Sequence, residues 1–194
     1  MPQAFSELGL RRKLRILAVD DTPFERGRDP TTFLIGLMFR ELTLELAIRE
    51  IIQVDGGDST DALVRMVRSP KVRDEVKVVM THGTTFAGLN VLDMRRFHSE
   101  TGVPIVAVTS REPTAEIERA IESAGLTEKL DLIRGNPPYS PLRTGRGYCY
   151  YSVIGLSRKD AEELILKYST ESKVPEQLRI TDIVAKLFQG CRIK

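Results

Sequence analysis

Three apolar runs with strand character follow one another near the start of the chain, and the segments between them leave no room for a helix. The runs cover 14–21, 32–40 and 43–53. The segment 21–31 contains two prolines and a glycine, which is typical of a loop, and the join after residue 40 is very short. Short joins favour antiparallel hairpins. We therefore predict that the fold begins with three neighbouring antiparallel strands.

The pattern then changes to an alternation of helices and buried strands. Apolar residues at helical spacing mark 61–69, and a second helix is predicted over 90–102. Near-continuous apolar runs predict strands over 75–81 and 103–109. Such an alternation implies right-handed parallel crossovers. The fourth strand is therefore expected beside the first, parallel to it.

Together these patterns predict an α/β fold with a mixed sheet of order 3-2-1-4-5, which is the ribonuclease H-like arrangement. A helix over 117–124, a C-terminal strand over 147–156 and two C-terminal helices complete it. The main alternative, a doubly wound nucleotide-binding sheet, needs a helix between the first two strands, and 21–31 is too short and broken for one. We expect a single domain over 1–194, because this length and an apolar fraction of 41% suit one core.

Composition narrows the class of protein. The net charge of +2 is too small to predict nucleic-acid binding by itself. Cys149 and Cys191 lie far apart in the sequence, which argues against a thiolate zinc site and against a disulfide framework. No apolar run is long enough for a signal peptide or a membrane span, so we expect a cytoplasmic protein without a membrane partner. The oligomeric state stays open.

Polar residues gather where the first and fourth strands are predicted to end. Asp20 and Asp21 close the first strand, and Thr81 and His82 close the fourth. The ends of two parallel neighbours lie side by side, which is where open α/β sheets bind ligands. Carboxylates there could hold Mg²⁺ or Mn²⁺, which prefer oxygen ligands. We therefore predict a catalytic site at this edge of the sheet.

Two further acids follow the third strand and could approach this site from its flank. We predict Asp20, Asp55 and Asp58 as metal ligands, and Asp20, Asp21, Asp58 and His82 as catalytic residues. A divalent ion there would activate water and stabilise the leaving oxygen of a phosphodiester. Structural alternatives stay open: the two adjacent aspartates could form a turn, Asp58 could cap a helix, and His82 could be a neutral hydrogen-bonding residue.

The segment RGNPPYSPLRTGRG, residues 134–147, contains three arginines and no acid. Its prolines and glycines predict a long mobile loop. Arg134, Arg143 and Arg146 could grip phosphates, and Tyr139 could stack on a base. The partner would then be DNA or RNA, and binding would come mainly from phosphate contacts. The alternative is a solvated loop without a partner.

Five segments spread over most of the chain carry a resemblance to a known family. They are VDDTPF (19–24), VDGGDSTDAL (54–63), HGTTFAGLNVLDM (82–94), TGVPIVAVTSREP (101–113) and VPEQLRI (174–180). Through them the chain resembles a mainly archaeal family of domains of unknown function, number ninety-nine, which is distantly related to endonuclease V. That relation implies metal-dependent cutting of nucleic-acid strands near deaminated adenine. It also implies a metal-binding aspartate at Asp20 and a second acid roughly at Asp55 or Asp58.

The resemblance breaks down at His82. Endonuclease V has an aspartate before a glycine at the end of its fourth strand, and this chain has His82 before Gly83. Imidazole suits zinc, copper, nickel or iron better than magnesium, and it carries no negative charge. Three hypotheses therefore stay open. The chain is a metal-dependent endonuclease, a nucleic-acid-binding module that lost catalysis through His82, or, less favoured, an enzyme acting on a small phosphorylated molecule in the same cleft.

Overall fold

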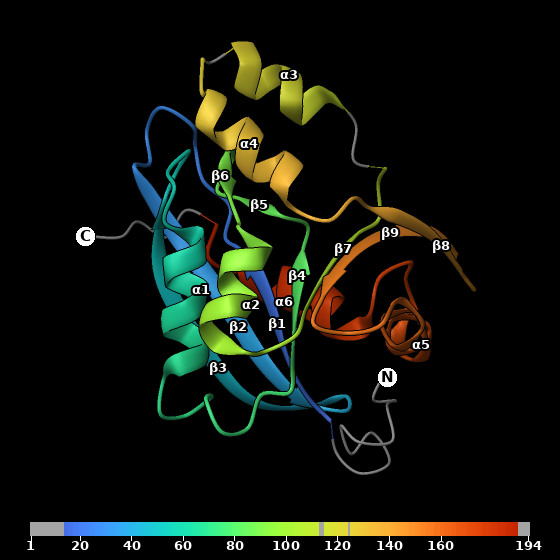
Figure 1. The fold of residues 1–194 in the computed structure, drawn as a ribbon. Coiled ribbons are helices and arrows are strands. Elements are labelled where there is room, and N and C mark those ends of the chain that lie inside the picture. The colour runs from blue at the N-terminus through green and yellow to red at the C-terminus, as the bar shows by residue number, and fades with distance from the viewer. Residues whose placement is uncertain (1–13, 113–114, 124, 190–194) are drawn as a thin grey trace.

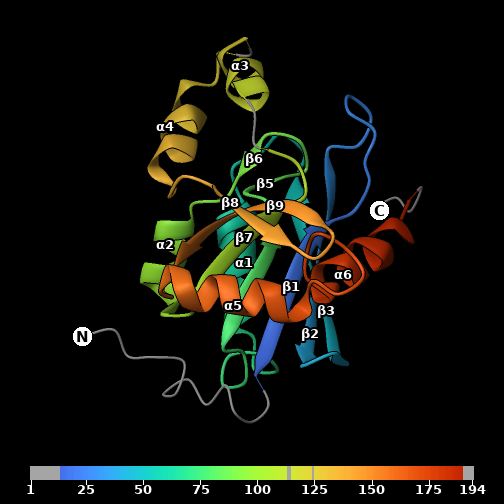
Figure 2. The same cartoon turned by 90° about the vertical axis from the view of Figure 1, so that its right-hand side faces the viewer.

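The computed structural model describes residues 14–112, 115–123 and 125–189. A seven-stranded mixed sheet with the order β3-β2-β1-β4-β7-β9-β8 forms its centre, and helices cover both faces (Figures 1 and 2). A separate two-stranded ribbon, β5-β6, lies between the end of β4 and α2 in the chain. No helix in these described ranges is long and apolar enough to cross a membrane.

The element bounds are close to those predicted for the longer strands and helices. The strands are β1 (Arg15–Asp21), β2 (Thr31–Arg40), β3 (Thr43–Gln53), β4 (Val78–His82), β5 (Thr85–Phe86), β6 (Asn90–Val91), β7 (Ile105–Thr109), β8 (Ser140–Thr144) and β9 (Gly147–Ile154). The helices are α1 (Ser59–Arg68), α2 (Met94–Thr101), α3 (Ala115–Ser123), α4 (Thr127–Gly135), α5 (Arg158–Tyr168) and α6 (Glu176–Lys186).

The strand order predicted from the sequence is confirmed for the first five positions of the sheet. β1 pairs antiparallel with β2, and β2 pairs antiparallel with β3. β1 pairs in parallel with β4, and β4 in parallel with β7. The ribonuclease H-like arrangement is therefore present, and β9 and β8 extend it by two antiparallel strands.

The segment 134–147 is not the mobile loop that its composition predicted. It contains the end of α4 and the whole of β8, which is the last strand of the sheet. The prediction was wrong because proline argues against a central strand but is tolerated on an edge strand, where an N–H group is not needed for pairing on the outer side. Pro141 occupies such an edge position in β8.

The helix predicted over 90–102 begins later than its apolar pattern indicated. Asn90 and Val91 form β6, and α2 starts at Met94. The cap is Asp93, whose side chain accepts a hydrogen bond from the backbone N–H of Arg96 at 2.9 Å. Helix α4, over Thr127–Gly135, was not predicted from the sequence.

Alternation along the strands divides the apolar residues between two cores. Ile16 and Ala18 of β1 face the core that includes residues of α5 and α6. Leu17 and Val19 face the opposite core, which includes residues of α1 and α2. Since successive residues of a strand point to opposite faces, Asp20 belongs to the α5–α6 face and Asp21 to the α1–α2 face. Cys149 is buried in the α5–α6 core, and Cys191 lies outside the described residues.

Helix α1 receives its N-terminal cap from a distant part of the chain. Asn90 is fully buried, and its Oδ1 accepts a hydrogen bond from the backbone N–H of Ser59 at 3.0 Å. Its Nδ2 donates to the backbone oxygen of Gln53 at 2.9 Å and to Asp58 Oδ1 at 2.7 Å. One amide therefore ties β6 to the end of β3 and to the first turn of α1.

Replacing Asn90 by alanine should destabilise the fold by about 2–4 kcal/mol, because three hydrogen bonds are lost, one of them to the backbone N–H of the buried Ser59. Urea unfolding followed by circular dichroism measures the change. Asp93→Ala is the matched comparison, since it removes one helix cap and should cost about 1 kcal/mol. Equal losses in the two variants would contradict the tying role of Asn90.

Candidate metal centre

Asp20 and His82 meet at the carboxyl ends of two parallel neighbours. In the register of β1 and β4, Val19 lies opposite Thr81, so the next residue of each strand is Asp20 and His82. His82 Nδ1 lies 3.0 Å from Asp20 Oδ2. The buried Asp20 carboxylate also accepts a hydrogen bond from the backbone N–H of Asp21 at 3.0 Å. The structure thus brings together these two residues of the predicted site.

Helix α6 supplies a third ligand group that the sequence analysis did not include. One ligand atom each from Asp20, His82 and Asp182 lie within 4.8 Å of one another. The signal for Asp182 was present in the sequence. Buried residues of α6 include Leu178, Thr181 and Ala185, and Asp182 shares their face at helical spacing. An acid on the buried face of an amphipathic helix has to meet a polar partner, and here it meets the end of the sheet.

The two carboxylates favour a cation between them. The hydrogen bond with Asp20 raises the pKa of His82 above its ordinary value, and the charges of Asp20, Asp182 and Asp21 add to this effect. Burial acts in the opposite direction and lowers it. A protonated imidazole would therefore offset part of the negative charge of the cluster when no other cation is bound.

The same donors fit a single divalent ion. Ligand atoms at about 2.0–2.3 Å from one ion lie up to about 4.6 Å apart, which is close to the spread of this cluster. Two carboxylates with one imidazole suit Mn²⁺, Fe²⁺ or Zn²⁺ better than Mg²⁺, whose usual ligands are all oxygen. A metal would replace the proton of His82 as the positive charge, so proton and metal compete for the site.

Asp21 does not join this cluster, although it is adjacent to Asp20 in the sequence. It points to the opposite face of the sheet, where its Oδ2 accepts a hydrogen bond from the backbone N–H of Ala87 at 2.9 Å. Burial raises the pKa of Asp21 to about 6, and the charge of Asp20 contributes. The predicted catalytic role thus has no geometric support, and Asp21 anchors the loop that follows β4.

Asp58, predicted as a metal ligand and catalytic residue, is used in the structure to hold a turn. Its carboxylate oxygens accept hydrogen bonds from the backbone N–H of Gln53, at 3.1 and 3.3 Å, and from the amide of Asn90. Asp58 is the N-cap residue of α1 by position, but its side chain makes no cap hydrogen bond to that helix. Asp58 thus occupies the predicted cap position, but its side chain does not make the predicted capping contact.

Asp55, also predicted as a metal ligand, holds the neighbouring loops. Its carboxylate accepts hydrogen bonds from Arg26 at 3.0 and 3.1 Å and from the backbone N–H of Leu89 at 2.8 Å. The backbone oxygen of Asp55 accepts a short hydrogen bond from Lys129. Among the residues that the structure describes, the carboxylates of Asp55 and Asp58 form no ligand cluster with Asp20. The ligand roles of these two residues stay predictions that this geometry does not support.

Two of the arginines predicted to bind nucleic acid have partners within the protein. Arg134, at the end of α4, pairs with Glu118 at 2.9 Å and with Glu122 at 3.4 Å. Arg146 donates to the backbone oxygen of Thr170 at 2.9 Å. These two guanidinium groups hold helix pairs and loops together, because the tertiary fold supplies them with acceptors that the local sequence lacks.

Tyr139 and Arg143 have different surroundings. The hydroxyl of Tyr139 lies 3.4 Å from Thr84 Oγ1, and burial raises its pKa to about 12. The ring packs against the α1–α2 core, so it is not available to stack on a base. Arg143 lies exposed on β8, opposite Tyr148 of β9.

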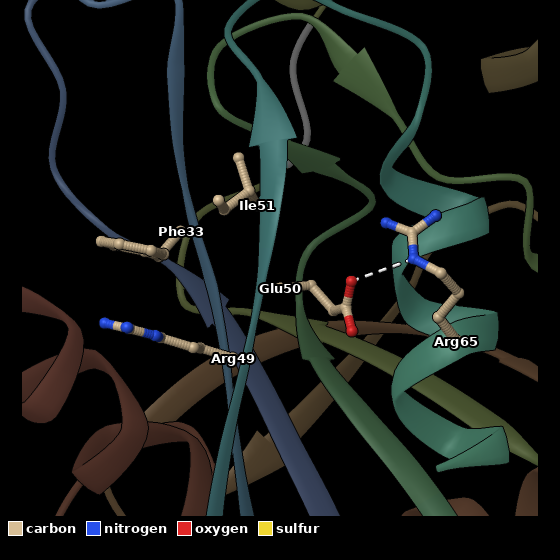
Figure 3. A pocket seen from close by; sticks show the side chains of 5 residues that line it. All are labelled: Phe33, Arg49, Glu50, Ile51 and Arg65. Atoms are coloured by element: carbon tan, nitrogen blue, oxygen red, sulfur yellow. Dashed lines mark hydrogen bonds and ion pairs between the residues drawn. The ribbon is translucent and has the colours of Figure 1, made fainter. Parts of the chain in front are cut away.

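A surface pocket of about 330 Å³ includes none of the three residues of the candidate metal centre. Its lining residues are Phe33, Arg49, Glu50, Ile51 and Arg65 (Figure 3). They come from β2, β3 and α1, and the ion pair between Glu50 and Arg65 measures 3.0 Å. This pocket thus offers no support for a small-molecule cleft at Asp20.

Sequence comparison relates the chain to a family of nucleases. A family profile described as endonuclease dU matches residues 12–189. A UPF0215 protein of Pyrococcus furiosus is 32% identical over 181 residues, which cover 91% of this chain and 92% of the relative. A UPF0215 protein of Thermococcus kodakarensis is also 32% identical, over 183 residues and the same shares of the two chains. The archaeal relatives agree with the predicted resemblance; the numbered family stays a prediction.

Comparison of structures confirms the predicted relation in fold to endonuclease V. The structure is similar to that of a protein of unknown function from Archaeoglobus fulgidus, with a TM-score of 0.77, 28% identity and coverage of 89% and 96% of the two chains. Endonuclease V of Bacillus subtilis gives a TM-score of 0.62 at 12% identity, covering 95% and 89%. Endonuclease V of Ciona intestinalis, in complex with inosine-containing DNA, gives 0.56 at 11%, covering 95% and 90%.

The share of the free energy of unfolding that Asp21 and His82 contribute should fall as the pH rises. Asp21 and His82 both have raised pKa values in the folded state, so each contributes stability that is present at low pH and is lost as the pH rises through its folded pKa. For Asp21 the loss falls between about pH 4 and pH 6. Asparagine at position 21 does not ionise, so Asp21→Asn should remove the loss of stability that ionised Asp21 causes at high pH. The variant should therefore be more stable than the wild type at pH 8, by about 1–2 kcal/mol.

Denaturant unfolding with EDTA between pH 4 and pH 8 measures this difference. The amide oxygen of the variant keeps the acceptor for Ala87. Asp74→Asn is the control, because the Asp74 side chain is 77% exposed and should have no such effect. Parallel pH profiles of wild type and Asp21→Asn would contradict the assignment.

Proposed function

Because the chain belongs to the endonuclease dU family, we propose that it is a divalent-metal-dependent endonuclease that cuts DNA strands containing deoxyuridine. The observation that carries the proposal is the meeting of Asp20, His82 and Asp182, with ligand atoms within 4.8 Å of one another. They lie at the carboxyl ends of two parallel strands, where ligands bind in open α/β sheets.

Each of the three side chains has a defined part in this proposal. Asp20 and Asp182 supply the negative charge that holds a cation, and Asp20 fixes the orientation of the imidazole ring through the 3.0 Å contact with His82. When neutral His82 donates from Nδ1 to Asp20, its Nε2 lone pair is available to bind a metal or take a proton. A bound divalent ion would activate water and stabilise the leaving oxygen of a phosphodiester.

A catalytically inactive nucleic-acid-binding module is the second candidate function. The observation that favours it is the pairing of His82 with Asp20, which satisfies the buried carboxylate without any metal. DNA as the partner is supported by the fold, because the Ciona endonuclease V with the same fold holds inosine-containing DNA. The two candidates share the partner and differ in metal binding and turnover.

Mn²⁺ should bind more tightly than Mg²⁺, and both should bind more tightly as the pH rises. A proton on His82 must leave before a metal binds there, and the raised pKa of His82 strengthens this competition. Calorimetric titration at pH 6, 7 and 8 measures this. Asp20→Asn and Asp182→Asn should each weaken binding at least ten-fold, while Asp74→Asn should not.

The variant His82→Asp tests the donor set in the same titration. It replaces imidazole by a third oxygen ligand and should shift the preference toward Mg²⁺. Tight metal binding that survives both Asp20→Asn and Asp182→Asn would show that the ion binds elsewhere.

With Mn²⁺, the protein should cut an end-labelled DNA strand that contains one deoxyuridine. A matched strand with thymidine at that position should stay intact, and an inosine strand tests the endonuclease V substrate. Asp20→Asn and Asp182→Asn should lower the rate more than 100-fold, because each removes charge that holds the ion. Denaturing gel electrophoresis measures the products.

Three outcomes separate the candidate functions. Cutting that depends on Asp20 and Asp182 supports the endonuclease. Strand binding without cutting under any tested metal supports the binding module. Failure both to bind and to cut DNA or RNA strands at low salt contradicts both functions and favours a small phosphorylated substrate.

A further inference from the structure

The outer face of the β8–β9 hairpin presents an aromatic and cationic surface. Tyr148 of β9 is 54% exposed, and Arg143 of β8, which is also exposed, lies directly opposite it. Pro141 and Tyr150 form a pair two residues along. Residues that lie opposite each other, or two apart, share one face of a sheet. We call this face, made of Pro141, Arg143, Tyr148 and Tyr150, the hairpin face.

Core packing does not account for the exposed side chains of the hairpin face. The inner side of the hairpin already supplies the contacts that hold it to the protein, since Cys149 and Tyr151 are buried in the α5–α6 core and Leu142 packs against it. The register of β9 with β7 fixes the same alternation, because Tyr151 pairs with Val108 of the core. The exposed ring of Tyr148 therefore has no part in this core.

The hairpin face lies at the same end of the sheet as the candidate metal centre. His82 pairs with Val108 of β7, and Val108 pairs with Tyr151 of β9. Tyr148 is thus two strands across from His82 and three residues further along, and this odd offset from Tyr151 places its ring on the opposite face of the sheet from His82. With about 4.8 Å between strands and 3.3 Å per residue, their backbone positions are on the order of 10–15 Å apart within the sheet. A few nucleotides of one strand that passes over the carboxyl ends of β4 and β7 can span this distance.

Charge on the hairpin face suits a polyanion. Arg143 makes no ion pair within the described ranges, and Arg111 is exposed just beyond the end of β7. One carboxylate lies nearby: Glu112 Oε2 is 3.5 Å from the hydroxyl of Tyr150. That contact holds Tyr150 at the base of the face, and Tyr148 remains the exposed ring beside an arginine.

We propose that the hairpin face holds an unpaired base of the nucleic-acid strand that reaches the metal centre. The ring of Tyr148 stacks on the base, and Arg143 binds a neighbouring phosphate. Every base has a π-face, so this contact tolerates any sequence, and the site gives affinity without choosing the damaged base. The inference rests on the proposed function, because the bound strand is the substrate of that site.

The chain offers a direct probe of stacking because it contains no tryptophan. Tyr148→Trp introduces a single indole on the hairpin face. A thymidine oligonucleotide without deoxyuridine is titrated in EDTA, so that neither metal nor cleavage is needed. Saturable quenching of the indole emission is the expected result, and an unchanged emission on binding overturns the proposal.

Affinity measured by fluorescence anisotropy separates stacking from charge. Tyr148→Ala should weaken binding about five-fold or more, and Tyr148→Phe should stay near wild type, because the phenyl ring still stacks. Arg143→Gln should lower the log–log salt slope by about one unit. The controls are Leu187→Ala, at a residue 75% exposed on another face, and Arg73→Gln, whose side chain is 62% exposed. Neither control should change affinity.

The results also distinguish this inference from the proposed function. If the Tyr148→Ala variant binds the strand as tightly as the wild type does, the proposal for the hairpin face is overturned and the endonuclease proposal stands. Binding that depends on Tyr148, without cutting of the deoxyuridine strand, supports the hairpin face and contradicts the endonuclease. Dimerisation in sedimentation velocity that disappears with Tyr148→Ala would identify a second copy as the occupant and overturn the proposal.

Discussion

The parallel pairing of β1 with β4 is the constraint on which the candidate site depends. It sets Asp20 beside His82 at the same end of the sheet, and α6 lies across β1 so that Asp182 reaches the same point. A shift of one residue in either strand would turn its polar end to the opposite face, as the orientation of Asp21 shows. The backbone hydrogen bonds of two strands therefore fix the chemistry of the site.

Because two carboxylates surround one imidazole, a proton and a metal ion compete for the site. A proton on His82 would offset part of the charge of Asp20 and Asp182, and the raised pKa of His82 has the direction expected for that stabilisation. A third carboxylate in place of His82 would leave uncompensated charge and would require a cation. The histidine thus reduces the negative charge that a metal would have to offset, and it lowers the affinity of the site for hard ions.

The acids beyond the third strand hold the loops around the site. Asp55 and Asp58 have the residue type of metal ligands, and their place after a strand made them reasonable candidates. Their carboxylates instead accept hydrogen bonds from Arg26, Gln53, Leu89 and Asn90. An acid in a turn can bind a backbone N–H group or an ion equally well, and local sequence does not tell which partner the fold brings to it.

The sequence alone determined the strand order of the first five strands and the meeting of Asp20 with His82. Short joins allow only antiparallel hairpins, and a helix between two buried strands imposes a parallel crossover, so local pattern decides the topology there. Only the tertiary structure decided the place of Asp182, the edge strand β8 and the exposure of Tyr148. These features depend on which faces of distant elements pack together. Packing sets the partners of a side chain across the fold, and the neighbouring sequence does not determine them.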